Sequence, residues 1–221
     1  MNATQRDDGL VGIYGGTFDP VHLGHIRTAL QLRRELPFAE IRMLPAGQPP
    51  HRDPPEASAA QRWYMITRVT GPERGLVADD RELRRPGPSY AVDTLEELRA
   101  ELGEARPLAW ILGMDAFAGF DTWHRWREIP RLAHLVVMTR PGVREPERGP
   151  VADLLRERRA VQPQALTERP AGRILVWRVE PLDFSATDVR ECIRSGKQPR
   201  FLIPGVIWSY IQREGLYGSA H

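Results

Sequence analysis

The chain has 221 residues, of which 41% are hydrophobic, and its formal net charge at pH 7 is +2. This length and apolar fraction can fill one sizeable core, and the near-neutral charge, with arginines interleaved with acids, argues against a nucleic-acid partner. The single cysteine, Cys192, excludes an internal disulfide framework. Because no apolar run approaches the ~20 residues that span a bilayer, and the first ten residues lack an apolar signal-peptide core, we expect a cytoplasmic protein with no membrane partner.

Short apolar runs alternate along the chain with segments of helical periodicity, which is typical of α/β proteins. In chain order, the runs predict strands at residues 10–14, 40–45, 76–79, 108–113, 134–140 and 173–179. The segments between and after them predict helices at residues 23–36, 58–69, 89–102, 151–160, 184–196 and 203–215. This alternation favours a Rossmann-like, doubly wound parallel sheet with helices on both faces and a small C-terminal helical part.

The domain organisation follows from the same pattern. Residues 10–217 would form a single domain, in which 185–217 is the helical end, preceded by a flexible tip at 1–9. The Pro-rich segment 46–57 cannot be regular and predicts a long exposed loop, a kind of segment that is often functional. Residues 142–172 are charged and rich in turns, and we expect them at the periphery.

The segment "GGTFDPVHLGH", residues 15–25, directly follows the first predicted strand. Gly15 and Gly16 allow the backbone to approach a ligand closely, and the helix that follows presents unpaired N–H groups to an anion such as phosphate. His22 and His25 are three residues apart, so both lie on one face of that helix. Their imidazoles could donate hydrogen bonds to negative charge that develops on a phosphate.

Other interpretations of this segment fit less well. Its spacing matches neither the GxGxxG dinucleotide fingerprint nor a P-loop. A zinc site is a poor match, because the two histidines lack both an HExxH pattern and neighbouring cysteines. An ordinary helix start with two histidines is the remaining alternative, which the paired glycines and the preceding strand disfavour.

A second segment, "FSATDVR" at residues 184–190, predicts another phosphate site. Ser185 can cap a helix, Thr187 lies in its first turn, and Arg190 follows one turn later on the same side. Hydroxyl groups at a helix N-terminus beside an arginine suit a phosphate, although a plain cap beside a solvated arginine is the alternative. Two such segments in one domain suggest a polyphosphate held between them.

Together the two segments resemble the HxGH and (S/T)xxR signatures of the nucleotidyltransferase superfamily, which bind the triphosphate of ATP. The segments "LPAGQPPHR", "RPGPSYAVDTLEELR", "WILGMDAFAGFDTWHRWREI" and "HLVVMTRPG" are similar to bacterial nicotinate-nucleotide adenylyltransferases, and the resemblance extends over about residues 10–217. It implies that the adenylyl group of ATP passes to nicotinate mononucleotide by direct in-line attack, giving deamido-NAD and pyrophosphate in NAD biosynthesis.

The resemblance also implies the residues of the ATP site. His22, His25 and Arg190 would be catalytic, with the histidines at the transferring group. The phosphates and the ATP sugar would contact Gly15, Gly16, Thr17, Phe18, Gly113, Asp115, Ser185, Thr187 and Arg190, with Gly113 and Asp115 at the sugar. Mg²⁺ would accompany ATP and be held largely by phosphates and water, with no protein residue assigned as its ligand.

For the nicotinate mononucleotide, the resemblance implies that Trp123 stacks on the pyridine ring and that backbone amides at Tyr90–Ala91 and His124 bind the carboxylate. Ala91 stands where the family often has a threonine or serine, so a hydroxyl is lost while the amide remains. Arg52 and Arg140, together with His51, are further candidates near phosphates, with solvated loop charges as the alternative.

Two rival functions stay open at this point. A related adenylyltransferase could use nicotinamide mononucleotide, phosphopantetheine or a sugar-type phosphate, although "PSYAVDTL" and "DTWHRW" disfavour it. A non-catalytic nucleotide-binding module would not need both histidines together with Thr187 and Arg190. The sequence leaves open whether the protein is a monomer or a homo-oligomer.

Overall fold

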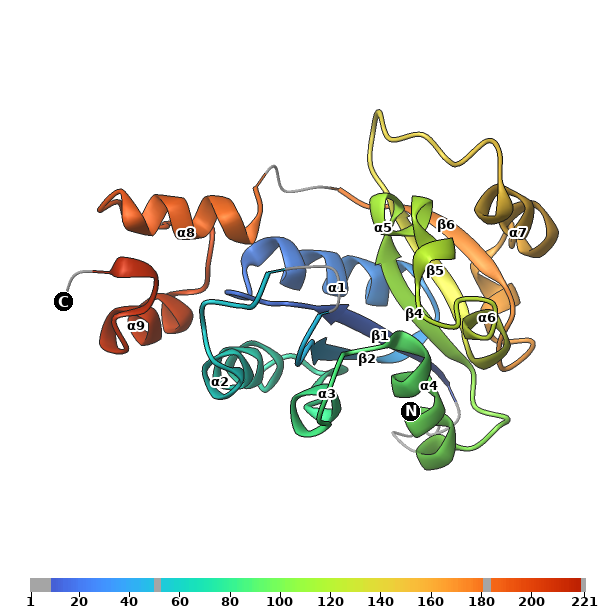
Figure 1. Cartoon of the computed structure of the whole chain (residues 1–221), viewed down its shortest axis with the longest axis horizontal. Coiled ribbons are helices and arrows are strands. Elements are labelled where there is room, and N and C mark those ends of the chain that lie inside the picture. Colours follow the sequence, from blue (N-terminus) through green and yellow to red (C-terminus); the bar gives the residue numbers. More distant parts are fainter. Residues whose placement is uncertain (1–8, 50–52, 181–183, 220–221) are drawn as a thin grey trace, which may run out of the picture.

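The computed structural model describes residues 9–49, 53–180 and 184–219. Its centre is a six-stranded sheet in the order β3-β2-β1-β4-β5-β6, in which all neighbouring strands are parallel (Figure 1). The strands are β1 (Leu10–Gly16), β2 (Phe38–Pro45), β3 (Leu76–Ala78), β4 (Leu108–Gly113), β5 (His134–Thr139) and β6 (Ile174–Arg178). The strand order reverses between β1 and β4, which confirms the doubly wound Rossmann-like sheet predicted from the alternating pattern.

The helices connect the strands and extend beyond the last one. The α-helices are α1 (Leu23–Glu35), α2 (Ala59–Thr70), α3 (Arg81–Arg84), α4 (Ala91–Leu102), α5 (Met114–Ala118), α6 (Ile129–Leu132), α7 (Pro150–Arg158), α8 (Ala186–Arg194) and α9 (Gly205–Arg213). Short 3₁₀ turns are η1 (Phe120–Thr122), η2 (Pro163–Leu166) and η3 (Leu216–Gly218). Figure 1 shows α8 and α9 together at one end of the molecule. Among the described residues, no helix combines the length and apolar character needed to cross a membrane.

The sheet separates two hydrophobic cores. In β4, Ala109 and Ile111 enter one core while Trp110 and Leu112 enter the other, as the alternation of side chains along a strand requires. The first core receives side chains from α1, α2, α8 and α9, and the second from α4, α5, α6 and α7. Burial on both faces explains why the strands appear in the sequence as continuous apolar runs.

The ends of several elements differ from the prediction. β1 continues through Gly15 and Gly16, because these glycines pair with Leu44 and Pro45 of β2. The helix predicted from Ser89 begins only at Ala91. The short helical segments α3, α5, η1, α6, η2 and η3 were not predicted, since three to five residues are too few to show a helical period.

The reason for the late start of α4 is the side chain of Ser89. Its Oγ accepts hydrogen bonds from the backbone N–H groups of Gly47 and Gln48 at 2.9 and 3.2 Å. Ser89 therefore fastens the loop after β2 instead of capping the helix. The predicted tip at residues 1–9 lies almost wholly outside the described residues.

Candidate active site

Three cavities meet at the carboxyl ends of β1, β4 and β5, where ligands bind in open α/β sheets. Tyr14 near the end of β1, Gly113 at the end of β4 and Met138 near the end of β5 line all three cavities. Ligands bound in the three cavities would therefore touch one another at this point.

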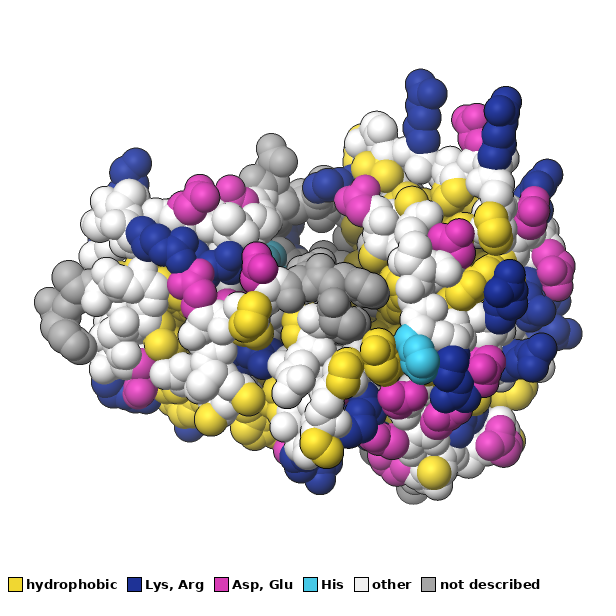
Figure 2. Space-filling view, in the orientation of Figure 1, with side chains coloured by type: hydrophobic (Ala, Val, Ile, Leu, Met, Phe, Trp, Pro, Cys, Tyr) yellow, Lys and Arg dark blue, Asp and Glu magenta, His cyan; other side chains and the backbone are white. Residues whose placement is uncertain are grey.

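The first of them, which we call the polar cavity, has a volume of about 1000 Å³ and lies between the β1–α1 loop and the start of α8. Figure 2 shows the surface hollowed between the part that contains α8 and the part that contains α5. The fold thus brings the two predicted phosphate segments to the same cavity. The predicted residues that line it are Gly15, Gly16, Thr17, Phe18, His22, His25, Gly113, Ser185, Thr187 and Arg190.

The rings of His22 and His25 stack in this cavity, with their centroids 3.7 Å apart and their planes at 27°. Burial lowers the pKa of His22 to about 4, although the charge of Asp188 acts in the opposite direction. The backbone N–H of His22 donates to Nδ1 of His25 at 3.3 Å. In its neutral form His25 must therefore have its proton on Nε2, as a hydrogen-bond donor.

Phe18 packs against one of the two histidines, His25. Its backbone has a φ of 49°, in the left-handed region that is unusual for a bulky residue. Its side chain is buried and packs edge-on against the rings of His25, at 4.9 Å, and Tyr14, at 6.0 Å. This packing offsets the cost of the strained backbone and fixes the position of His25.

Arg190 is held in the polar cavity by three partners from different parts of the chain. Its Nη1 donates to the backbone oxygen of Asp19 at 2.7 Å, and its Nη2 donates to Oγ1 of Thr187 at 3.2 Å. Its Nε lies 2.9 Å from Oε1 of Glu56. These contacts confirm that Thr187 and Arg190 share one side of α8, and they orient the planar guanidinium before any ligand binds.

The local structure of the second segment is also as predicted. Ser185 is the N-cap of α8: its Oγ accepts from the backbone N–H of Asp188 at 3.3 Å, while the Asp188 carboxylate accepts from the Ser185 N–H at 2.6 Å. This reciprocal capping box fixes the first turn of α8.

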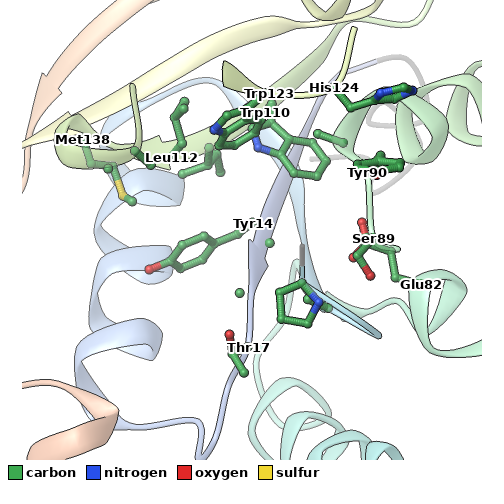
Figure 3. Close-up of a pocket in the computed structure, with 18 residues that line it drawn as sticks. Tyr14, Thr17, Glu82, Ser89, Tyr90, Trp110, Leu112, Trp123, His124 and Met138 are labelled. Carbon is green, nitrogen blue, oxygen red and sulfur yellow. The ribbon is translucent and has the colours of Figure 1, made fainter. Parts of the chain in front are cut away.

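The second cavity, the aromatic pocket, has a volume of about 260 Å³ (Figure 3). Trp110 and Trp123 form one wall, with ring centroids 6.5 Å apart and planes at 86°. The rings of Tyr90 and His124 stack at 4.3 Å on another side. Ala91, the first residue of α4, lines the pocket as well, and no side chain of the described residues caps this helix. An uncapped helix N-terminus beside aromatic rings suits a flat ring with an acidic group.

The third cavity, of about 270 Å³, borders both histidines. It is lined by Asp115 and Arg140, whose Oδ2 and Nη2 lie 3.7 Å apart. Arg140 was expected near the mononucleotide, but it does not line the aromatic pocket. Arg52 and His51 lie outside the described residues.

Sequence reasoning missed Asp19, Glu56 and Tyr217. Asp19 is 4% exposed, and its carboxylate accepts hydrogen bonds from residues 37 to 198 positions away in the chain. No local pattern marks such partners. The one available signal was a single acid, next to a proline, in a turn that otherwise contains glycines, a threonine and apolar residues.

Among the described residues, no three side chains of the types His, Cys, Asp and Glu gather closely enough to hold an ion.

Comparisons with known proteins agree on one family. A family model described as cytidylyltransferase-like matches residues 13–192. The chain is 45% identical over 213 residues to a "probable nicotinate-nucleotide adenylyltransferase" of Pseudomonas aeruginosa (strain UCBPP-PA14), which covers 96% of this chain and 98% of the relative. It is also 45% identical over 207 residues to a protein of the same name from Marinobacter nauticus, covering 94% of this chain and 96% of that relative.

A solved structure shares the fold. The Plasmodium falciparum nicotinic acid mononucleotide adenylyltransferase complexed with NaAD superposes with a TM-score of 0.70 at 15% identity, covering 96% of this chain and 98% of that one. The curated relatives match at three times this identity over nearly their whole length. The chain therefore belongs to the nicotinate-nucleotide adenylyltransferase family of cytidylyltransferase-like nucleotidyltransferases.

Proposed function

We propose that this protein transfers the adenylyl group of ATP to nicotinate mononucleotide, giving deamido-NAD and pyrophosphate. An oxygen of the mononucleotide phosphate attacks the α-phosphorus of ATP. As that bond forms, the bond from the α-phosphorus to the bridging oxygen of the β-phosphate breaks, and pyrophosphate leaves with the electron pair. One observation supports this most directly: the polar cavity and the aromatic pocket share Tyr14, Gly15, Gly16 and Thr17, so the two phosphates would meet there.

ATP would occupy the polar cavity and the third cavity. Its triphosphate would lie against the backbone of Gly15–Phe18 and the start of α8, with the β- and γ-phosphates on Thr187 and Arg190. Its sugar would reach Gly113 and Asp115 in the third cavity, where the carboxylate can accept hydrogen bonds from ribose hydroxyls. Ser185 contributes indirectly, because it caps the helix that presents Thr187.

Catalysis then consists of positioning and of stabilising charge. The attacking phosphate is already an anion, so no general base is needed. His25 would donate its Nε2 proton in a hydrogen bond to the transferring phosphoryl group, and His22 would act beside it. A neutral His22 avoids charge repulsion within the stacked pair, and the position of Phe18 holds His25 against the strand end.

The aromatic pocket would bind the nicotinate half of the other substrate. Trp123 offers a face for the pyridine ring, and the amides at Tyr90–Ala91 and His124 offer donors for the carboxylate. Ala91 supplies only its backbone, since it has no hydroxyl. Arg140 would lie near the adenylyl side of the reaction, given its place in the third cavity.

Mg²⁺ is the cation proposed to accompany ATP. It would be held largely by phosphate oxygens and water. The ion would neutralise charge on the triphosphate. We further propose that the protein works in the cytoplasm, binds no nucleic acid, and folds as one domain over residues 10–217 with 185–217 as its helical end.

The test is a product assay with purified protein, ATP, Mg²⁺ and nicotinate mononucleotide. Pyrophosphate and deamido-NAD should appear in equal amounts, as measured by a coupled pyrophosphate assay and by chromatography. A protein that binds ATP but releases no pyrophosphate would be a non-catalytic module and would contradict the proposal. If the protein forms product from ATP and nicotinamide mononucleotide but not from ATP and nicotinate mononucleotide, the rival substrate is the correct one.

A further inference from the structure

The carboxylate of Asp19 is buried within the segment that surrounds the proposed phosphate site, yet it hydrogen-bonds to the protein itself. Oδ2 accepts from the backbone N–H of Glu56 at 2.8 Å, and Oδ1 accepts from the backbone N–H of Ala57 at 3.0 Å. Oδ1 also accepts from the hydroxyl of Tyr217 at 2.6 Å. Asp19 thereby joins the β1–α1 loop to the end of the Pro-rich loop and to the C-terminal turn η3.

The same residue contacts the proposed ATP ligand Arg190 through its backbone. The carbonyl oxygen of Asp19 accepts from Arg190 Nη1 at 2.7 Å. Glu56, whose amide is held by the Asp19 carboxylate, places its own carboxylate 2.9 Å from Arg190 Nε. Asp19 therefore fixes Arg190 twice, once directly and once through Glu56.

Tyr217, near the C-terminus, holds the Asp19 carboxylate through its hydroxyl group. It is 7% exposed and has a φ of 56°, so the chain adopts a left-handed conformation to turn this ring inward. Burial, reinforced by the neighbouring Asp19 charge, raises the pKa of the Tyr217 hydroxyl, so it remains a donor.

Arg62 places a buried positive charge against the backbone of the β1–α1 loop. It is 2% exposed and donates from Nη1 to the backbone oxygens of Thr17, at 2.9 Å, and Ala46, at 2.6 Å. Because Thr17 lies in the proposed phosphate loop, its hydrogen bond to this guanidinium fixes the backbone of the loop. The β1–α1 loop, Glu56–Ala57 and η3 thus form one hydrogen-bonded unit at the polar cavity.

We infer that Asp19 and Tyr217 are positioning residues for ATP: the Tyr217 hydroxyl holds the Asp19 carboxylate, and Asp19 in turn fixes Glu56, Ala57 and Arg190 at the polar cavity. This inference rests on the proposed function, since it assigns the polar cavity to ATP. Neither side chain takes part in the aromatic pocket, so the effect should concern one substrate only.

The test is Tyr217→Phe, which removes only the hydroxyl. Loss of one hydrogen bond to a charged group should raise the Kd and KM for ATP about 5- to 20-fold. The KM for nicotinate mononucleotide should change less than about twofold. ATP binding is measured by calorimetry in the absence of the mononucleotide, so it does not depend on turnover.

Tyr210→Phe is the matched control. Tyr210 is also 7% exposed and lies in α9, close to η3 in the chain, but its hydroxyl makes no hydrogen bond to any described residue. Both constants of this variant should stay within about twofold of the wild type, as a hydroxyl without a partner contributes little.

Asp19→Asn is the second variant, and it decides the matter independently of how well Tyr217→Phe folds. The asparagine amide would face N–H donors at Glu56 or Ala57, so ATP binding should weaken at least as much as in Tyr217→Phe. Unchanged ATP affinity in either folded variant, or equal losses for both substrates, would overturn the inference, because a purely structural role moves both constants together. Failure of the proposed function is seen separately, as absence of product from the wild type.

Discussion

The two stacked histidines have different surroundings. His22 is buried and neutral, whereas His25 accepts a hydrogen bond at Nδ1 and directs its remaining ring nitrogen away from that contact. Phe18, whose backbone is strained, packs edge-on against the ring of His25 and holds that ring in place. In the proposed reaction, a pair held in this way would donate hydrogen bonds without having to rearrange.

We expect His25→Ala to lower turnover by about 10²- to 10³-fold, as the loss of one preorganised donor does in other enzymes. The His22→Ala change should be as severe or more so, because His22 lies closer to the glycine turn. Turnover is measured at saturating substrates, and circular dichroism and Tm verify that each variant folds. A folded variant that keeps more than half of the activity would show that the histidine is not at the reacting group.

Arg190→Lys should weaken ATP binding while leaving the mononucleotide constant almost unchanged. An ammonium keeps the charge but cannot reach Asp19, Thr187 and Glu56 together as the planar guanidinium does. Arg194→Lys is the control, since Arg194 also pairs with Glu56 but does not line the polar cavity. Equal losses for both substrates in Arg190→Lys would mean that the arginine supports structure rather than ATP.

At the scale of single elements, α2 begins at the cap that Ser58 was expected to provide, and the structure extends this cap to a capping box with Gln61. Ser58 Oγ accepts from the N–H of Gln61 at 3.2 Å, and the Gln61 side chain accepts from the Ser58 N–H at 2.9 Å. The helix packs Met65 and Ile66 into the first core. Its stability therefore depends on both its cap and its buried face.

Ser58→Ala should lower the free energy of unfolding by about 1 kcal/mol, the usual cost of losing such a cap. For a chain of this size that corresponds to a fall in Tm of roughly 2–4 °C. Ser209→Ala, at an exposed position inside α9, is the control and should not destabilise, because alanine is the better helix former. An unchanged Tm for Ser58→Ala would show that packing alone sets the start of α2.

From the uncapped N-terminus of α4 we predict which mononucleotide the protein prefers. Nicotinate is negatively charged and nicotinamide is not, so convergent N–H groups at Tyr90–Ala91 and His124 should prefer the acid. An amide would leave these donors poorly matched at a cost of roughly 1–3 kcal/mol, or about 10- to 100-fold in kcat/KM. The measurement is kcat/KM for the two mononucleotides at saturating ATP, and comparable values would assign the pocket to the amide as well.

Trp123→Ala separates stacking from this preference. Stacking on the pyridine ring does not distinguish the acid from the amide, so both mononucleotides should bind more weakly and their ratio should stay largely the same. A variant whose ratio collapses toward one would place acid recognition on Trp123 rather than on the backbone amides.

At the scale of the whole molecule, two buried histidines make stability depend on pH. His134 at the start of β5 is fully buried; its Nδ1 accepts from the N–H of Arg173 at 3.0 Å, and its Nε2 lies 2.9 Å from the oxygen of Arg169. Burial lowers the pKa of His134 to about 4, as it does for His22. Both are neutral in the folded chain, whereas in the unfolded chain they take up protons below about pH 6.5.

Their contribution to stability is therefore complete above pH 6.5 and is lost as the pH falls toward 4. At pH 5 each histidine should have lost about 2 kcal/mol of its contribution to the free energy of unfolding. Burial raises the pKa of Glu82, which acts in the opposite direction, so the comparison uses a variant. Between pH 7 and pH 5, the free energy of unfolding measured with urea should fall less for His134→Asn than for the wild type. An equal fall in both proteins would show that His134 does not cause this pH dependence.

The sequence by itself determined the order of strands and helices, the helix caps at Ser58 and Ser185, and the two segments at the polar cavity. These features depend on neighbours within a few residues: apolar runs in strands, serines at helix starts, and glycines at the end of β1. Each is a short-range pattern that physical chemistry links to one local structure.

Only the tertiary structure decided which distant residues meet. Asp19 reaches Tyr217 across 198 positions, and Arg62 reaches Thr17 across 45. Arg140 lines the third cavity rather than the aromatic pocket. Ser89 lies outside α4 and accepts a hydrogen bond from the loop after β2. Such contacts depend on how the strands are ordered and how the loops close over their carboxyl ends, and no local pattern in the chain encodes that geometry.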